Sequence, residues 1–233
     1  MLLRLFFIVL FTVLTARATD QPPYLQEALT RFNPAIPPDW AYTLTTQRGD
    51  ESSVERFDPS RPTEQQWTLL QRNHRPATAE ENSRYDSYRI STSPSARASF
   101  VRDDIDLQSL RLVREDETRA EYHASFRDDL KDPMLHRLEL QLTVSKSRAA
   151  IEQFVLLLTA PYSPVLTVSM LELRVETTLS PPEEARPALP LRIISRFRGR
   201  VFLFKSIEED VQTAFSDYVL VRPHDPQPAG TPP

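Results

Sequence analysis

The sequence predicts an α+β fold that is mainly β, with a single curved antiparallel sheet of about eleven strands wrapped partly around two short helices. Three observations support this class. Apolar and polar residues alternate along most of the chain beyond residue 106, the connections are mostly short enough for antiparallel neighbours, and only two segments carry helix signals. With 40% apolar and 26% charged residues among 233, the composition is that of a globular protein.

The N-terminal segment has the pattern of a signal peptide. Arg4 precedes an apolar run over residues 5–14, and Ala16-Arg17-Ala18 has the small-x-small form that a signal peptidase accepts, so cleavage is expected after Ala18. The run is too short to cross a bilayer. The chain has no cysteine for a lipid anchor or a disulfide, and no asparagine stands in a glycosylation sequon. We therefore expect a periplasmic protein, with signal peptide 1–18 and no transmembrane segment in the mature chain.

Two segments carry helix signals. Prolines 22 and 23 begin the first, in which apolar residues stand at 24, 25, 28, 29 and 32, the spacing of one helical face. The second begins near Thr78. Its hydroxyl can accept a hydrogen bond from the backbone N–H of Glu81, while the Glu81 carboxylate accepts one from the backbone N–H of Thr78. It is expected to end near Arg89, because the following Ser/Thr/Pro-rich stretch competes with helical hydrogen bonds.

The remaining chain reads as strands in one domain, 19–222, followed by a disordered Pro-rich tail, 223–233. A turn at Gly49 joins the first two strands into a hairpin. A long connection at 180–190 contains four prolines and is expected to leave the sheet. The expected strands cover residues 39–45, 51–57, 66–70, 107–115, 118–126, 135–145, 149–159, 165–179, 191–198, 200–206 and 211–221.

The apolar pattern requires that part of the sheet be covered on both faces. Residues 138–144 alternate cleanly, as a strand with one wet face does. In contrast, residues 154–158 are apolar at both odd and even positions, so both faces of that strand are apolar. Within residues 168–175 the apolar positions change from one face of the strand to the other. Water would otherwise meet a large apolar patch. The cover can be the two helices, a partner, or a bound apolar ligand.

An exported chain with about eleven meandering antiparallel strands, and helices before the first strand and after the third, resembles the periplasmic lipoprotein carrier family (LolA/LolB-like). The resemblance extends over residues 39–221 as architecture. It implies a half-barrel with the helices on its concave face, where acyl chains are shielded. The segment from Arg56-Phe57-Asp58-Pro59 through Trp67-Thr68-Leu69-Leu70 to Pro76-Ala77-Thr78-Ala79-Glu80-Glu81 is also similar to exported bacterial proteins of unknown activity.

Several kinds of chemistry are excluded by composition and spacing. Glycines stand only at 49, 199 and 230, so neither a dinucleotide fingerprint nor a P-loop can form. The chain has no glycine-flanked nucleophilic serine, no thiol and no short-spaced histidine set. A formal net charge of −4 gives no attraction to nucleic acid. We therefore expect no cofactor, no metal, no catalytic residue and a non-enzymatic role.

One histidine pair is a candidate metal or acid/base site. His123 and His136 flank an expected hairpin, but matching the apolar faces of its strands places the two imidazoles on opposite faces. We therefore expect His123 to be half-exposed and His136 to lie on the apolar sheet face, and we do not expect the two side chains to act together.

Two groups of residues are candidate binding sites. The first group is either ordinary core or the wall of a cavity for an apolar ligand: Trp40, Tyr42, Trp67, Leu138, Leu140, Phe154, Leu156, Leu158 and Met170. The second shares one strand parity and is either a solvated outer face or a contact for anionic lipid headgroups or an acidic partner: Arg192, Arg196, Arg198 and Arg200.

These observations favour a periplasmic carrier or binding protein for a lipid or another apolar ligand. The alternative is a cell-envelope interaction module that uses a sheet edge or the concave face to bind an envelope protein or a second copy. A hydrolase whose site lacks the known motifs is a third alternative.

Overall fold

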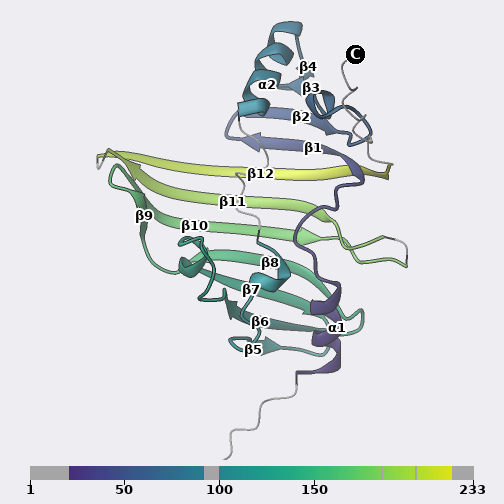
Figure 1. Ribbon diagram of the computed structural model, residues 1–233, viewed down its shortest axis with the longest axis vertical. Helices are drawn as coiled ribbons and strands as arrows, with labels where there is room; N and C mark the ends of the chain where they lie inside the picture. The colour runs from purple at the N-terminus through teal and green to yellow at the C-terminus, as the bar shows by residue number, and fades with distance from the viewer. Residues whose placement is uncertain (1–20, 92–99, 185, 203, 222–233) are drawn as a thin grey trace, which may run out of the picture.

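The computed structural model describes residues 21–91, 100–184, 186–202 and 204–221 (Figure 1). The expected signal peptide, 1–18, and the expected tail, 223–233, lie outside these residues. The helices are α1 (Pro23–Arg31) and α2 (Ala79–Ser91). The strands are β1 (Trp40–Arg48), β2 (Glu51–Phe57), β3 (Trp67–Arg72), β4 (Arg75–Pro76), β5 (Arg111–Glu115), β6 (Arg119–Ser125), β7 (Leu138–Ser145), β8 (Ala150–Leu158), β9 (Tyr162–Val165), β10 (Val168–Leu179), β11 (Pro190–Val201) and β12 (Lys205–Leu220).

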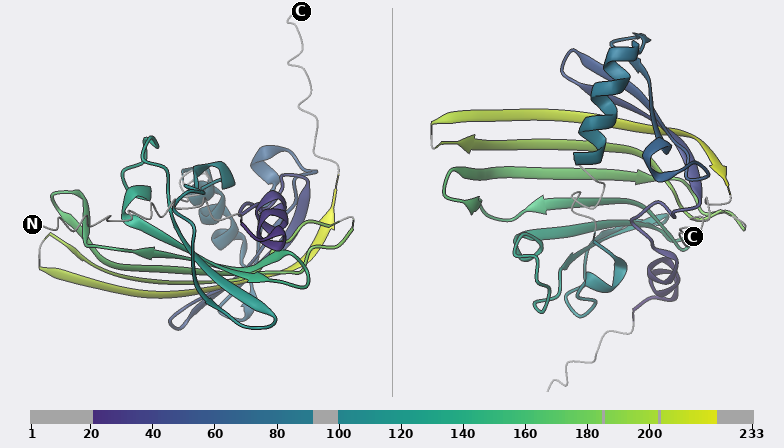
Figure 2. Two further views of the ribbon diagram at one scale, coloured as in Figure 1. Left: turned by 90° about the horizontal axis from the view of Figure 1, so that it is seen from below. Right: turned by 45° about the horizontal axis from the view of Figure 1, so that its top comes forward.

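All twelve strands belong to one antiparallel sheet, which confirms the predicted fold class. The order is β4-β3-β2-β1-β12-β11-β10-β8-β7-β6-β5, and β9 pairs with β10 off this path. The sheet is strongly curved and remains open, because its end strands do not pair with each other. Both helices lie on its concave face, α1 over one end and α2 over the other (Figure 2).

Helix α1 is held by its apolar face. Leu25, Ala28 and Leu29 are buried, as is Phe32 just beyond the last turn, and they pack on the concave face of β7 and β8. The hydroxyl groups of Tyr24 and Tyr122 lie 2.7 Å apart and form a hydrogen bond across the same interface. Burial raises the pKa of Tyr122 above its usual value, so this phenol stays protonated at neutral pH.

Helix α2 starts with the predicted capping box. The backbone N–H of Glu81 donates to the Thr78 hydroxyl at 3.2 Å, and the Thr78 N–H donates to the Glu81 carboxylate at 2.9 Å. Arg75 donates two hydrogen bonds to the same carboxylate and, with the Thr78 bonds, lowers the pKa of Glu81 to about 2. The Tyr85 hydroxyl donates to Glu55 of β2 at 2.8 Å, which ties the helix to the concave face.

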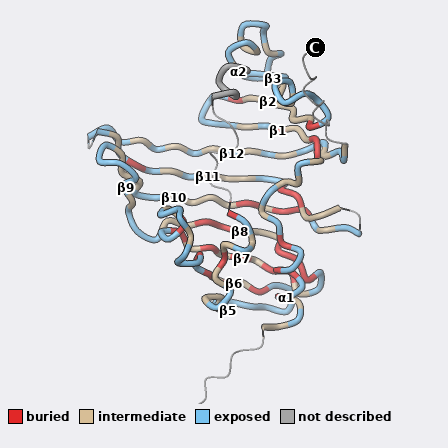
Figure 3. The backbone as a smooth tube through the Cα atoms, viewed as in Figure 1, coloured by how far each residue is buried: buried red, intermediate tan, exposed pale blue. Residues whose placement is uncertain are grey.

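The buried core is concentrated under α1 rather than spread over the whole sheet (Figure 3). Side chains of β6, β7 and β8 pack there against α1 and against Phe100, which contacts Phe32, Phe126 and Phe154. Apart from Gly199, the described residues of β11 beyond Pro190 and all residues of β12 are half-buried or exposed. The middle of the sheet is therefore covered less than the end beneath α1.

Three sequence expectations about strands were wrong in detail. Segments 191–198 and 200–206 are not two strands, because β11 continues through Gly199 to Val201 and a turn then leads into β12. Residues 135–137 form a 3-10 helix before β7 instead of its start. The short strands β4 and β9 were not expected, since two to four residues carry too little alternation to be recognised.

Candidate functional site

The strand register shows which side chains share the concave face. Val175 of β10 lies opposite Ser195 of β11, which lies opposite Val211 of β12. Residues at the same parity share this face with the side chains that contact α1. The apolar members in the middle of the sheet, named here the central strip, are Leu173, Val175, Ile193, Phe197, Ile207, Val211 and Phe215.

All seven residues of the central strip are half-buried. On β12 the residues of the opposite parity, such as Glu208, Asp210 and Gln212, are exposed, so the concave side of this strand is the more sheltered one. Polar members of the same face include Ser195, Thr213 and Glu209, and Glu209 forms an ion pair with Arg48 at 2.7 Å. The strip is thus an apolar surface with a few neutral or paired polar groups.

One end of the concave face is filled core. Leu138, Leu140, Phe154 and Leu156 are buried beneath α1, and Leu158 packs against the same cluster while staying half-buried. Of the predicted ligand-binding residues, these five therefore contact the helix and its neighbours in the structure. A side chain such as Leu140, with 0% exposure, presents no surface to a ligand in this arrangement.

The other end carries an aromatic cluster near α2. The centroid of the Tyr42 ring lies 5–6 Å from those of four other aromatic rings: 5.2 Å from Phe57, 6.0 Å from Trp67, 5.9 Å from Phe215 and 5.8 Å from Tyr218. Trp40 is buried, and its ring packs edge-on against Tyr218 with the two ring centroids 6.3 Å apart. Burial raises the pKa of Tyr218, whose hydroxyl donates to the Pro190 carbonyl at 2.6 Å. The predicted residues Trp40, Tyr42 and Trp67 thus come together, and Phe215 joins them to the central strip.

Met170 lies at a third place, opposite Gly199 where β10 also pairs with β9. It is half-buried on the concave face, at the far end of β10 from the α1 core. The structure therefore distributes the nine predicted residues over three regions of one face. It places the central strip between them.

The four predicted arginines lie on the convex face. Arg198 forms ion pairs with Glu208 at 2.8 Å and Glu172 at 3.6 Å, and Arg196 lies 3.9 Å from Asp210. Arg192 donates to the Gln212 side chain at 2.6 Å. Arg200 is exposed and has no ion pair with any residue that the structure describes. Three of these arginines thus form ion pairs or a hydrogen bond with side chains of the neighbouring strands.

The two histidines do not form a joint site. The Nδ1 atom of His123 lies 2.9 Å from Glu139 on the convex face, and its Nε2 atom lies 3.3 Å from Glu121. The expectation for His136 was wrong, because it precedes β7 and is exposed instead of lying on the apolar sheet face. Within the described ranges no cluster of three or more His, Asp or Glu side chains could hold a metal ion.

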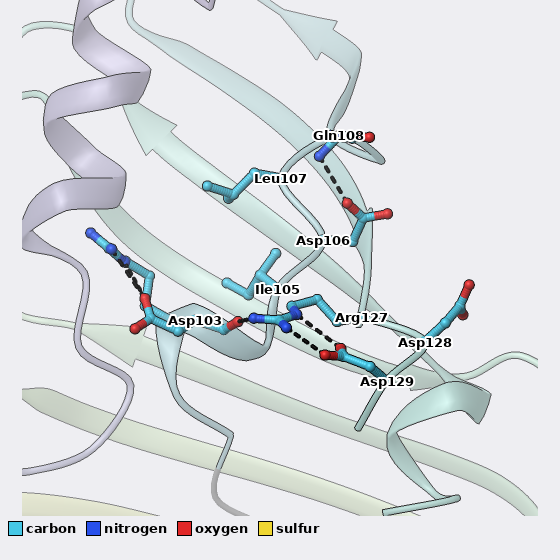
Figure 4. A pocket seen from close by; sticks show the side chains of 9 residues that line it. Asp103, Ile105, Asp106, Leu107, Gln108, Arg127, Asp128 and Asp129 are labelled. Atoms are coloured by element: carbon cyan, nitrogen blue, oxygen red, sulfur yellow. Dashed lines mark hydrogen bonds and ion pairs between the residues drawn. The ribbon is translucent and has the colours of Figure 1, made fainter. Parts of the chain in front are cut away.

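A separate depression of about 660 Å³ lies near β6 and is lined by charged side chains (Figure 4). Two ion pairs lie within it: Arg127 donates to Asp129, and Arg102 lies 3.0 Å from Asp103. The bond from Arg127 lowers the pKa of Asp129. Asp106 accepts the backbone N–H of Gln108 at 3.0 Å. Asp128 makes no ion pair with another described residue, but it is a single exposed carboxylate, which points to no particular ligand.

None of the seven residues of the central strip is among the ligand-binding residues that the sequence predicts. Part of their signal was present, since Val211, Thr213 and Phe215 stand at alternate positions of one strand, although the charged Glu209 interrupts the pattern before them. The strongest apolar runs lie in β7 and β8, and the ligand-binding residues predicted there are the ones that α1 covers. The most strongly apolar strands are therefore the ones that form the core, whereas the strand with the weaker alternation belongs to the more open surface.

Comparisons with known proteins give a likeness of architecture. No family model matches the sequence, and no curated protein matches it. Among solved structures, a LolA superfamily protein from Nitrosomonas europaea aligns with 85% of this chain and 92% of its own, at 15% identity and a TM-score of 0.36. No described helix is long and apolar enough to cross a membrane.

Proposed function

We propose that the protein is a non-enzymatic carrier of the bacterial periplasm that binds a lipid acyl chain, or a similar apolar group, on the central strip between α1 and α2. The observation that carries this proposal is the set of seven half-buried apolar side chains on the concave face of β10, β11 and β12. Both helices lie on this face, so a bound chain would be flanked at either end (Figure 2).

The dimensions of the strip suit an acyl chain. From Ile207 to Phe215 a strand advances roughly 26 Å at ~3.3 Å per residue. One acyl chain, which fills half of a bilayer core, extends about 15 Å. Burying ten methylenes contributes about 8 kcal/mol before ordering costs are subtracted, so binding would be reversible. The strip would bind by burial and shape, because the polar residues on the same face are either neutral, as Ser195 and Thr213 are, or ion-paired, as Glu209 is with Arg48.

A matched pair of substitutions tests this function. Ile193 and Ile194 are adjacent in β11, are both half-buried, and lie on the concave and convex faces respectively. Ile193→Asn is expected to weaken binding of a fluorophore-labelled fatty acid about tenfold, because a polar amide then faces the apolar chain. Ile194→Asn is expected to bind as the unaltered protein does.

Fluorescence titration gives the affinities, and native mass spectrometry of protein purified from its own compartment shows whether a lipid is bound. Equal losses in the two variants would show that the effect is on stability and not on the concave face. Absence of fatty acid binding by the unaltered protein would exclude the proposal.

A second candidate function is association between two copies through the free sheet edge. The sheet order ends at β5, whose five residues are all exposed, including Leu112 at 49% and Val113 at 52%. An edge strand with apolar side chains can pair with the same strand of a second copy. Sedimentation should then show a concentration-dependent dimer that Val113→Lys abolishes, since lysine opposes edge pairing. A monomer at every concentration would exclude this function.

A further inference from the structure

Two turns at one end of the sheet form an exposed apolar projection. The turn between β9 and β10 contains Leu166, and the turn between β11 and β12 contains Phe202 and Phe204. The Phe202 N–H donates to the Thr167 carbonyl at 2.7 Å, which joins the two turns. In Figure 1 they lie at the left, where β11 and β12 extend beyond the ends of β6, β7 and β8. We name this feature the apex and define it by Val165, Leu166, Phe202 and Phe204.

The exposure of the apex is unusual for such large apolar side chains. The exposed fractions are 55% for Val165, 95% for Leu166, 60% for Phe202 and 85% for Phe204. Single exposed apolar residues are common on soluble proteins, but a joined group of four marks a contact surface. Phe202 also has φ of 52°, a left-handed conformation that bulky residues seldom adopt, and its ring remains in solvent.

The charges around the apex have one sign. Residues 160–171 and 199–207 contain no Asp or Glu, although the whole chain carries a formal charge of −4. Arg200 and Lys205 flank the apex, are exposed, and make no ion pair with any other described residue. The neighbouring Arg198 differs, because Glu172 and Glu208 neutralise it. The apex therefore presents apolar side chains beside two uncompensated positive charges.

This combination fits the interface of a lipid bilayer better than a protein surface. Apolar side chains enter the boundary between headgroups and acyl chains, while nearby lysine and arginine side chains meet the phosphates of anionic lipids. We propose that the apex docks the protein onto bilayers that contain anionic phospholipids. Leu166 and Phe204 enter the interface, and Arg200 and Lys205 give the preference for negative charge. This inference does not depend on whether the central strip binds an acyl chain.

Vesicle flotation tests the docking directly. The protein is mixed with vesicles of phosphatidylcholine alone or of phosphatidylcholine with phosphatidylglycerol, without added fatty acid. The unaltered protein is expected to float with the anionic vesicles. Leu166→Ser with Phe204→Ser is expected to reduce that binding at least tenfold, because both apolar contacts are lost. Arg200→Gln with Lys205→Gln is expected to reduce it about thirtyfold on anionic vesicles and to leave the weaker binding to neutral vesicles unchanged.

A control pair and a second readout keep the result specific. Leu70→Ser with Leu220→Ser removes two exposed apolar side chains, 43% and 58% exposed, that lie outside the apex, and should float as the unaltered protein does. Phe204→Trp should show a blue-shifted emission with anionic vesicles and quenching by brominated phospholipids. All variants carry the same N-terminus, so differences report on the apex.

Three results would overturn the proposal. The unaltered protein could fail to float with anionic vesicles, or the apex variants could float unchanged. Alternatively, the unaltered protein could form a dimer in sedimentation that Leu166→Ser with Phe204→Ser dissociates, without any vesicle binding. That last result would assign the apex to contact between copies of this chain.

Discussion

Replacing Phe154 with alanine is expected to lower the free energy of unfolding by about 3–5 kcal/mol. Phe154 is 5% exposed and lies where β8 meets α1. Its ring packs edge-on against Phe32 at 5.6 Å and against Phe100 at 5.6 Å. Truncation removes both contacts and leaves a void that the rigid sheet fills only in part, so the cost exceeds the lost transfer free energy alone.

Urea denaturation followed by far-UV circular dichroism measures this change. Phe154→Leu serves as a conservative control and should cost clearly less, because most of the apolar volume is kept. Phe57→Ala removes a half-buried ring from the aromatic cluster near α2 and should cost less than Phe154→Ala as well. A loss below about 1 kcal/mol for Phe154→Ala would show that α1 is not packed on β8 as the structure has it.

Replacing Gly199 with alanine is expected to destabilise the protein by about 1–3 kcal/mol through overpacking. A Cβ atom at this position would lie 2.6 Å from the Phe197 ring and 2.7 Å from the Ser169 backbone carbonyl. The ring can rotate, but the carbonyl belongs to β10 and moves only with its strand. Because Phe197 belongs to the central strip, the same substitution should also weaken fatty acid binding.

Two further variants separate the causes of this effect. Phe197→Ala with Gly199→Ala removes the clash with the ring but keeps the clash with Ser169, so a destabilisation beyond that of Phe197→Ala alone should remain. Gly49→Ala provides the contrast. A Cβ there meets nothing within 4 Å, and its cost comes from a φ of 55° instead. If Gly199→Ala unfolds at the same urea concentration as the unaltered protein, the close approach of β10 and β11 is wrong.

Local signals in the sequence were sufficient for most elements. The capping box of α2 was predicted because both of its bonds lie within four residues, from Thr78 to Glu81. The hairpin at Gly49 was predicted for a similar local reason. At Gly199 the local pattern predicts a break between strands, although this residue lies inside β11. Its role is the close approach of Ser169 from another strand, which no local pattern reveals.

The candidate site was harder to predict than the fold. Leu140 and Val211 both stand in alternating strands, and alternation shows only that one face of each strand is apolar. Leu140 is covered because α1 packs on it, whereas Val211 lies where the described helices leave the sheet less covered. The apex was missed for a related reason. Leu166 and Phe202 are distant in sequence, and the antiparallel register of β10 and β11 brings their turns together.

The sequence by itself determined the elements of this protein, because periods of two and of about 3.6 residues, turn residues and caps placed nearly every strand and both helices. Only the tertiary structure decided which apolar side chains are core, which form the central strip, and which project at the apex. Periodicity is a property of neighbouring residues, but burial depends on which distant segment lies against a face. That outcome is set by the curvature of the sheet and by the packing of α1 and α2 onto it.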